Sequence, residues 1–174
     1  MDLTTHRVRT VTWADRLEFA TAAELSGLEF LQAMARGEIP SAPMMDLIGM
    51  RLISAREGET VFRLLPGEFH YNPMWTVHGG VYATMLDSAA ACAVHTTLPA
   101  GARFSTLDLS VRLLKAIRAD TGEITATGRV VHESRNFALA EARLEDSTGK
   151  LLATATAGCS VVRPRLPATG ETGV

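Results

Sequence analysis

The chain is poor in cysteine, with two among its 174 residues. Cys92 and Cys159 both stand in apolar surroundings, and the sequence contains no CxxC pair and no spacing typical of metal ligands. Because no signal peptide is present either, we expect two reduced core residues in a cytoplasmic protein that uses no metal and no cofactor. A disulfide between the two cysteines is the alternative.

An excess of charge of either sign is also absent. The formal net charge is -2, which argues against nucleic acid as a partner, because proteins that bind nucleic acid present a basic face. One long and weakly charged run occurs, over residues 77–94, and Asp87 near its centre would be costly in lipid. We therefore interpret this run as a core helix and expect no membrane partner.

The first quarter of the chain has helical composition. Residues 13–25 predict one helix, and a second begins at Ser26, which forms an S-x-x-E capping box with Glu29. The segment SAPMMD, residues 41–46, is expected to be a linker. The predicted parts of the chain are an N-terminal helical extension over 1–45, a main domain over 46–163 and a disordered, Pro/Gly-rich tail over 164–174.

From Leu47 onward the apolar period is two, which indicates strands. A hairpin turning at Arg56-Glu57-Gly58 precedes the helix. Four strand segments follow it: 104–117, whose inward face is predicted to hold Leu107, Leu109, Val111 and Leu113, then 123–134, 136–146 and 150–162. Alanine-rich faces in the last segments let a helix lie close, so we predict an α+β fold with a curved antiparallel sheet around one helix. Such a sheet leaves its edges uncovered, so we expect a partner subunit.

Asp87 is the residue that most needs an explanation. In a helix that begins near Gly79, the neighbours of Asp87 at three and four residues are alanines and Thr84. These neighbours provide no salt bridge, so an ionised carboxylate there costs free energy. The carboxylate could serve as a general base or a nucleophile, and the alternative is an arginine supplied by a partner chain.

The residues before Asp87 could polarise a carbonyl group. Gly79 and Gly80 open the helix, where backbone N–H groups lack intrahelical partners and a ligand can approach without meeting a Cβ atom. Asn72 and His78 precede the helix and could orient a water molecule or touch the carbonyl. Each residue also has a structural interpretation: the glycines form a tight turn, His78 caps the helix, and Asn72 before Pro73 forms a turn.

The stretch NPMWTVHGGVYATMLDSA resembles the N-x-x-G-x-x-HGG-x-x-x-x-x-x-D-x-A signature of hotdog-fold acyl-CoA thioesterases of the phenylacetate-pathway (PaaI-like) type. SGLEFLQAMARGEIPSAPM, STLDLSVRLLKA and HESRNFALAEARLEDSTGKLLATATA also resemble that family, so the resemblance spans residues 26–162. It implies a hotdog fold that assembles as a homodimer or a homotetramer, with the active site at the subunit interface. The implied substrate is an aryl- or medium-chain acyl-CoA.

The resemblance also implies roles for the residues above. Asp87 would attack the thioester carbonyl or activate water, the Gly79 N–H would polarise that carbonyl, and His78 and Asn72 would assist. Two positions depart from the family pattern, because Trp75 stands where the family often has glycine and Ala91 stands where some relatives have a hydroxyl group.

Coenzyme A carries phosphates that need cations or N–H donors. The candidates to bind the substrate are Gly80, Trp75, Ser134, Arg135 and Asn136, with Lys115 or Arg118 assisting and Met74, Met85 and Phe104 as guesses for the acyl pocket. The alternative for the basic residues is a solvated strand end. Two other functions stay open: a non-catalytic acyl-CoA or lipid-binding hotdog protein, and a hotdog hydratase or dehydratase.

Overall fold

The computed structural model describes residues 6–15 and 24–164. It contains one antiparallel sheet of six strands in the order β1-β2-β4-β5-β6-β3. The strands are β1 (Met50–Arg56), β2 (Glu59–Leu64), β3 (Arg103–Leu113), β4 (Ile124–Glu133), β5 (Phe137–Glu145) and β6 (Leu151–Val162), and the helices are α2 (Gly27–Ala35), α3 (Pro43–Ile48) and α4 (Gly79–His95). Short 3-10 turns occupy Glu68–His70 and Ala119–Thr121.

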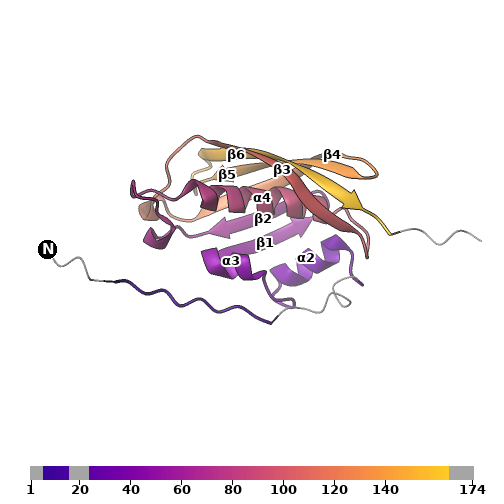
Figure 1. The fold of residues 1–174 in the computed structure, drawn as a ribbon, viewed down its shortest axis with the longest axis horizontal. Helices are drawn as coiled ribbons and strands as arrows, with labels where there is room; N and C mark the ends of the chain where they lie inside the picture. Colours follow the sequence, from indigo (N-terminus) through magenta and orange to yellow (C-terminus); the bar gives the residue numbers. More distant parts are fainter. Residues whose placement is uncertain (1–5, 16–23, 165–174) are drawn as a thin grey trace, which may run out of the picture.

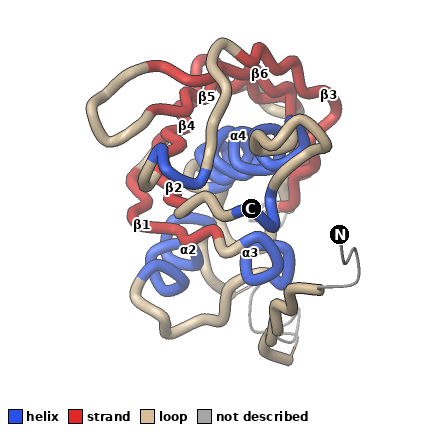
Figure 2. The backbone as a smooth tube through the Cα atoms, turned by 90° about the vertical axis from the view of Figure 1, so that its left-hand side faces the viewer, coloured by secondary structure: helices blue, strands red, loops and turns tan. Residues whose placement is uncertain are grey.

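The sheet curves around α4 (Figure 1). Seen along the helix, the strands form an arc that starts at β1 and ends at β3, and α2 and α3 lie on the open side of the arc (Figure 2). The predicted α+β hotdog architecture with one central helix is therefore confirmed. No helix in the two described ranges is both long and apolar enough to cross a membrane.

The helices of the N-terminal part follow from their capping residues. At α2 the Ser26 hydroxyl accepts from the Glu29 N–H and the Glu29 carboxylate accepts from the Ser26 N–H, so the predicted capping box is confirmed. The linker predicted over 41–46 is wrong, because α3 begins there. Pro43 fits the first turn of this helix, and Gly49 ends it with a φ of 75°. The helix predicted over 13–25 lies largely outside the described residues.

Small residues let α4 lie very close to the sheet. The predicted alanine faces of β4, β5 and β6 are buried, with Ala126, Ala140 and Ala157 fully so. At Gly128 a Cβ atom would stand 2.0 Å from the carbonyl oxygen of Ala89 on α4. No side chain fits at that distance, so this contact requires glycine.

The edge strand β3 differs from its predicted alternation. A β-bulge between Thr106 and Asp108 inserts Leu107, which changes the face that the following residues present. Leu107 is consequently 64% exposed, and Leu113 at the end of the strand is 53% exposed, so the predicted inward positions of both are wrong. Leu109 is half-buried as predicted, and Thr106, before the bulge, faces α4 instead.

The two cysteines are not bonded to each other. Cys159 is buried in β6, where its backbone pairs with that of Thr106, while Cys92 is half-buried on α4. The prediction of two free cysteines is confirmed, and the disulfide alternative is excluded.

Candidate active site

Asp87 lies in the middle of α4 beside the edge strand. Asp87 is half-buried, and its carboxylate accepts a hydrogen bond of 3.0 Å from the Thr106 hydroxyl. The helical neighbours of Asp87 provide no salt bridge, as expected, and β3, at its bulge, supplies a hydrogen-bond donor instead. No cation of the described residues forms an ion pair with Asp87. Its negative charge is thus stabilised by a neutral hydroxyl and keeps its second oxygen for other chemistry.

The N-terminus of α4 leaves one N–H group open. His78 is the N-cap, and its ring nitrogen Nδ1 accepts from the Gly80 N–H at 2.9 Å. The Val81 N–H bonds to the His78 carbonyl oxygen, also at 2.9 Å. In the described part of the chain nothing accepts from the Gly79 N–H, which points out of the positive end of the helix. His78 therefore has the predicted capping role, and of the two predicted glycines Gly79 is the one with a free donor.

The loop before α4 is held by Asn72. Its side-chain oxygen accepts from the Met74 N–H at 2.9 Å and from the Thr76 N–H and hydroxyl at 3.4 Å. This is the turn-forming role expected of an asparagine before proline. Trp75, inside the loop, has a φ of 59°, the left-handed region that glycine adopts most easily. The tryptophan thus adopts a backbone conformation that would suit the glycine often found here in the family pattern.

Gly79 and Asp87 cannot act on one atom within a single subunit. They are eight residues apart on one helix, which separates them by about 12 Å along its axis. Both nevertheless adjoin the exposed edge strand. A Cβ atom at Gly79 would lie 3.2 Å from Leu113 of β3, and Asp87 bonds to Thr106 of the same strand.

The predicted coenzyme A residues lie at the tip of the β4–β5 hairpin. The Ser134 N–H and hydroxyl both donate to the Phe137 carbonyl oxygen, and the Asn136 carbonyl accepts from the Val161 N–H. Arg135 is exposed between them. These three residues are close to one another, and the structure places none of them beside the two cavities described below.

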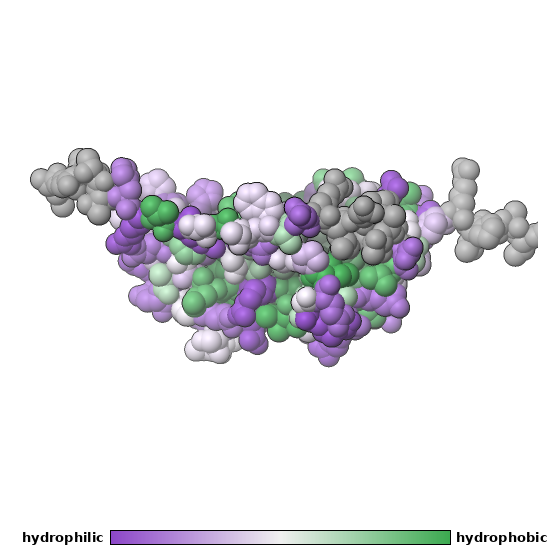
Figure 3. All heavy atoms as spheres, turned by 90° about the horizontal axis from the view of Figure 1, so that it is seen from below, coloured by the Kyte–Doolittle hydropathy of each residue, from purple (hydrophilic) through white to green (hydrophobic). Residues whose placement is uncertain are grey.

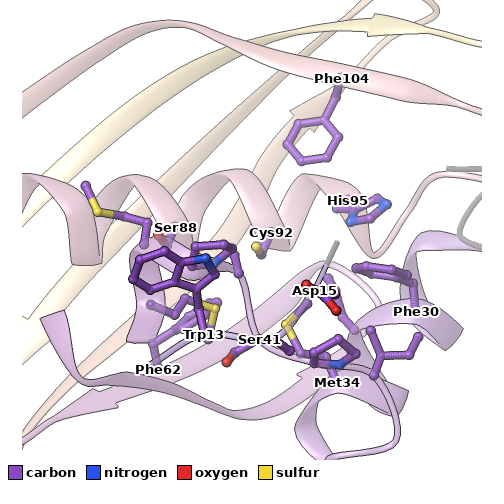
Figure 4. Close-up of a pocket in the computed structure, with 18 residues that line it drawn as sticks. Trp13, Asp15, Phe30, Met34, Ser41, Phe62, Ser88, Cys92, His95 and Phe104 are labelled. Atoms are coloured by element: carbon purple, nitrogen blue, oxygen red, sulfur yellow. The ribbon is translucent and has the colours of Figure 1, made fainter. Parts of the chain in front are cut away.

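A cavity of about 780 Å³ lies against the side of α4 that faces away from the sheet. Ser88, Cys92 and His95 follow one another along the helix on this side, and Phe104 reaches in from β3 (Figure 4). The remaining walls are mainly apolar and come from the N-terminal segment, α2, the connection between α2 and α3, α3 and β2: Trp13, Ala14, Asp15, Phe30, Leu31, Met34, Ile39, Pro40, Ser41, Ala42, Pro43, Met44, Met45 and Phe62. From the side of α2 and α3, apolar surface is visible between polar residues (Figure 3).

A second hollow, of about 590 Å³, lies at the N-terminal end of α4. His78, Gly80 and Thr84 line it, and it shares Met44 with the first cavity. Thr84 and Ser88 are one helical turn apart, so the two hollows follow the same side of α4 from its N-terminus toward its C-terminus.

Burial decides the protonation state of the other reactive groups. It raises the pKa of the Cys92 thiol to about 12, and the nearby Asp87 charge adds to the effect. A thiol with this pKa is not ionised at neutral pH and is a poor nucleophile. Burial also lowers the pKa of His95. Asp87 is therefore the group of this region best suited to act as a base or a nucleophile.

Some residues of the site could not be recognised from the sequence. Thr106 belongs to the outward face in the regular alternation, and the bulge that turns it inward has no clear sequence signal. Ser88, Cys92 and His95 recur at intervals of four and three residues on a mostly apolar helix, which is a detectable polar stripe. Of the residues suggested for the acyl pocket, Phe104 lines the first cavity, Met85 is fully buried and lines neither hollow, and Met74 and Trp75 are exposed and line neither.

Residues 74–153 match the family model of the thioesterase superfamily. The chain is 31% identical to human acyl-coenzyme A thioesterase 13 over 104 residues, which are 59% of this chain and 72% of that protein. It is 25% identical to 1,4-dihydroxy-2-naphthoyl-CoA hydrolase of Listeria monocytogenes over 122 residues, which are 70% of this chain and 98% of that protein.

The solved structures agree in fold. A phenylacetic acid degradation-related protein from Ralstonia eutropha JMP134 has a TM-score of 0.68 and 31% identity, covering 75% of this chain and 98% of that one. The PaaI protein of E. coli, at 22% identity, has the same TM-score of 0.68 and covers 79% of this chain and 96% of its own.

The curved sheet around α4 and these likenesses define a hotdog-fold protein. The chain belongs to the thioesterase superfamily, and its reaction class is thioester hydrolysis. The resemblance to PaaI-type thioesterases, drawn above from the HGG and Asp87 motif, is confirmed.

Proposed function

We propose that the protein hydrolyses an aryl- or medium-chain acyl-CoA to the free acid and coenzyme A. Asp87 acts as the nucleophile or the general base, and the Gly79 N–H stabilises the oxyanion that forms on the thioester carbonyl. The observation that carries this proposal is that Asp87 forms no ion pair with any described cation and directly precedes Ser88, which lines an apolar cavity, in a chain whose relatives include acyl-CoA hydrolases. His78 and Asn72 position the helix start and the loop that hold the N–H donor.

We further propose that each active site combines two subunits. The edge strand β3 has one free side, and Leu107, Leu113 and Leu114 near it are exposed. If two β3 strands pair antiparallel so that Thr106 faces Leu113 of the partner subunit, Asp87 approaches Gly79 of the partner subunit. Within one chain Gly79 and Asp87 are about 12 Å apart along α4, whereas this pairing brings Asp87 of one subunit toward Gly79 of the other. A dimer, alone or doubled into a tetramer, therefore has a complete site where a monomer has none.

The acyl group occupies the cavity that begins at Ser88, directly after Asp87. Its volume of about 780 Å³ is in the range of pockets that hold drug-sized ligands, so a ring or a medium-length chain fits. We assign contacts with the coenzyme A moiety to Arg135, Ser134 and Asn136, and to Gly80 and Trp75 at the loop. In support of this, Arg135 and Trp75 are exposed.

Two other functions fit the structure less well. A protein that only binds acyl-CoA gains nothing from the Asp87 carboxylate, because a negative charge near the site weakens the binding of an anionic ligand. A hotdog hydratase or dehydratase pairs its acid with a histidine. His95 is eight residues after Asp87, which places it about 12 Å away along the helix.

A thiol-release assay on CoA esters of different rings and chain lengths tests the reaction. We expect Asp87→Asn to lower turnover about 100- to 10,000-fold, because it removes the charge at nearly constant volume. Its melting temperature should stay close to that of the wild type. Unchanged hydrolysis in Asp87→Asn and Asp87→Ala would refute the role of Asp87, and binding without any thiol release would favour the binding protein.

The oxyanion donor can be tested at Gly79 alone. Gly79→Pro removes the N–H, and proline is tolerated at the first position of a helix, where His78 already has the extended conformation that precedes proline. We expect kcat to fall about 100- to 1,000-fold. Gly79→Ala is the matched control, since it adds the same Cβ atom beside Leu113 but keeps the N–H. Equal activity of the two variants would exclude the Gly79 N–H as the donor.

A further inference from the structure

His70 is a buried histidine outside the proposed set of reacting groups. The residue is 5% exposed, and its ring is bonded at both nitrogens. Nδ1 accepts from the Gly67 N–H at 3.0 Å, and Nε2, which therefore carries the ring proton, donates to the Ile48 carbonyl oxygen at 2.8 Å. Burial lowers the pKa of His70 and so favours this neutral ring at neutral pH. The ring joins the turn over Glu68–His70 to Ile48, the last residue of α3.

The backbone of His70 begins a short hairpin that leads into α4. Three pairings close this segment, the 70–78 hairpin: His70 with His78, Tyr71 with Val77, and Asn72 with Thr76. At its base the His70 carbonyl oxygen accepts from the His78 N–H at 2.8 Å. The next N–H along the chain is that of Gly79, the proposed oxyanion donor. His70 is thus one hydrogen bond and one residue away from that donor.

The direction of the Gly79 N–H depends on the backbone alone. Gly79 has no side chain whose packing could fix it. On one side of this peptide α4 holds the chain, and on the other side His78 is held by its place in the 70–78 hairpin. A group that acts on the transition state must stand within about 0.5 Å of its productive position. A shift at the base of the hairpin would therefore misplace the donor.

α3 is the support against which His70 holds the hairpin. Ile48 of α3 lines the second hollow together with His70 and His78, and Met44 of α3 lines both hollows. An apolar side chain in place of His70 would take from the Gly67 N–H and the Ile48 carbonyl the partner that they share. It would also release the base of the hairpin from α3.

We propose that His70 is a positioning residue for thioester hydrolysis, whose ring fixes the 70–78 hairpin against α3 and so holds the Gly79 N–H in place for the oxyanion. The inference rests on the proposed function and adds to it a residue that does not touch the substrate. His70 acts through Gly79, and its contribution exists only while that N–H is present.

His70→Phe tests this role, because it keeps a ring and removes both hydrogen bonds of the side chain. With phenylacetyl-CoA and octanoyl-CoA as probes, we expect kcat to fall about 10- to 100-fold, as a small displacement of a reacting group does. KM should change less than about threefold, since the donor acts mainly in the transition state. His70→Gln keeps a side-chain N–H for the Ile48 carbonyl and should lose less activity. It replaces His70→Phe in every measurement if the phenylalanine variant does not fold.

Thr60→Val is the control for a loss of stability alone. The buried Thr60 hydroxyl donates to the Ala89 carbonyl oxygen at 2.8 Å, on the side of α4 that faces the sheet. Removing this hydrogen bond should lower the melting temperature and leave kcat unchanged. A lower melting temperature with an unchanged kcat in His70→Phe as well would overturn the inference.

A double-mutant cycle with Gly79→Pro separates positioning from a general disturbance. Gly79→Pro has no N–H left to position, so adding His70→Phe should lower the kcat of this variant less than about twofold. The same fold-loss in both backgrounds would show that His70 acts independently of Gly79 and would overturn the inference. Failure of the wild type to hydrolyse any CoA ester would instead overturn the proposed function.

Discussion

The two sides of α4 have similar small residues but different surroundings. Toward the sheet, Leu86, Ala89 and Ala93 are fully buried against the alanine faces of the strands. Toward α2 and α3, Ser88 and Cys92 are half-buried and border a cavity of about 780 Å³. One side of the helix thus provides packing and the other provides a ligand site. The apolar composition of the helix does not by itself show which side is which.

The difference arises from what covers each side. The sheet approaches so closely that a Cβ atom at Gly128 would overlap the Ala89 carbonyl, and the Thr60 hydroxyl donates to that same oxygen at 2.8 Å. The opposite side is covered by two short helices and by residues 13–15, which leave space between them. Backbone-to-backbone packing tolerates no added atom, whereas the cavity side tolerates several.

The largest effect is expected where an atom is added on the sheet side. Gly128→Val would push a branched side chain into the backbone of Ala89 and Ala90, and we expect a loss of more than about 3 kcal/mol of folding free energy or no folded protein. Ser88→Val adds carbon atoms that face the cavity, and its melting temperature should change by only a few degrees. Thermal denaturation of both variants measures the difference. A stable Gly128→Val protein would show that the close approach is not required.

Most of the fold could be predicted from the sequence because its signals are local. The capping box at Ser26, the period-two strands and the alanine faces each reflect a few neighbouring residues. α3 was missed because six residues between Ala42 and Gly49 give too short a pattern. The bulge at Leu107 was missed because it depends on how β3 pairs with β6.

The candidate site was predictable in part for the same reason. The motif from Asn72 to Asp87 is contiguous, so its residue types and spacing are visible in the sequence. The hydrogen bond from Thr106 and the cavity walls join segments far apart in the chain, and only the folded structure shows them. The structure also shows why glycine would suit the position of Trp75, because this residue has a positive φ.

A smaller but still large effect concerns the edge of α4 beside β3. Mixing Asp87→Asn subunits with Gly79→Pro subunits should restore activity, because each mixed dimer has one site with an intact Gly79 and an intact Asp87. After unfolding and refolding together, we expect up to about a quarter of wild-type activity in a two-fold symmetric dimer. Each variant refolded alone is the control. Activity that stays at the level of the separate variants would argue against a site shared between two subunits.

A moderate effect of pH on stability is expected on the cavity side of α4, where His95 is located. Burial lowers the pKa of His95 below its unfolded value, so the folded state binds a proton less readily than the unfolded state. The free energy of unfolding is therefore at its full value at neutral pH, and it decreases as pH falls below about 6.5, where the unfolded state takes up the proton. His70, whose pKa burial also lowers, acts in the same direction. Urea denaturation at several pH values should show a shallower acid-side loss in His95→Phe than in the wild type, and identical slopes would contradict this.

The smallest effect is expected at the outer wall of the cavity. Trp13 lines the cavity but is 63% exposed, so it borders the ligand space without closing it. Trp13→Ala should widen the opening and shift the ratio of kcat/KM toward bulkier acyl groups by less than about tenfold, with little change in stability. Val8→Ala is the matched control, because Val8 lies on the same N-terminal segment, is 89% exposed and does not line the cavity. If both variants changed selectivity equally, the effect could not be assigned to the Trp13 side chain as part of the cavity wall.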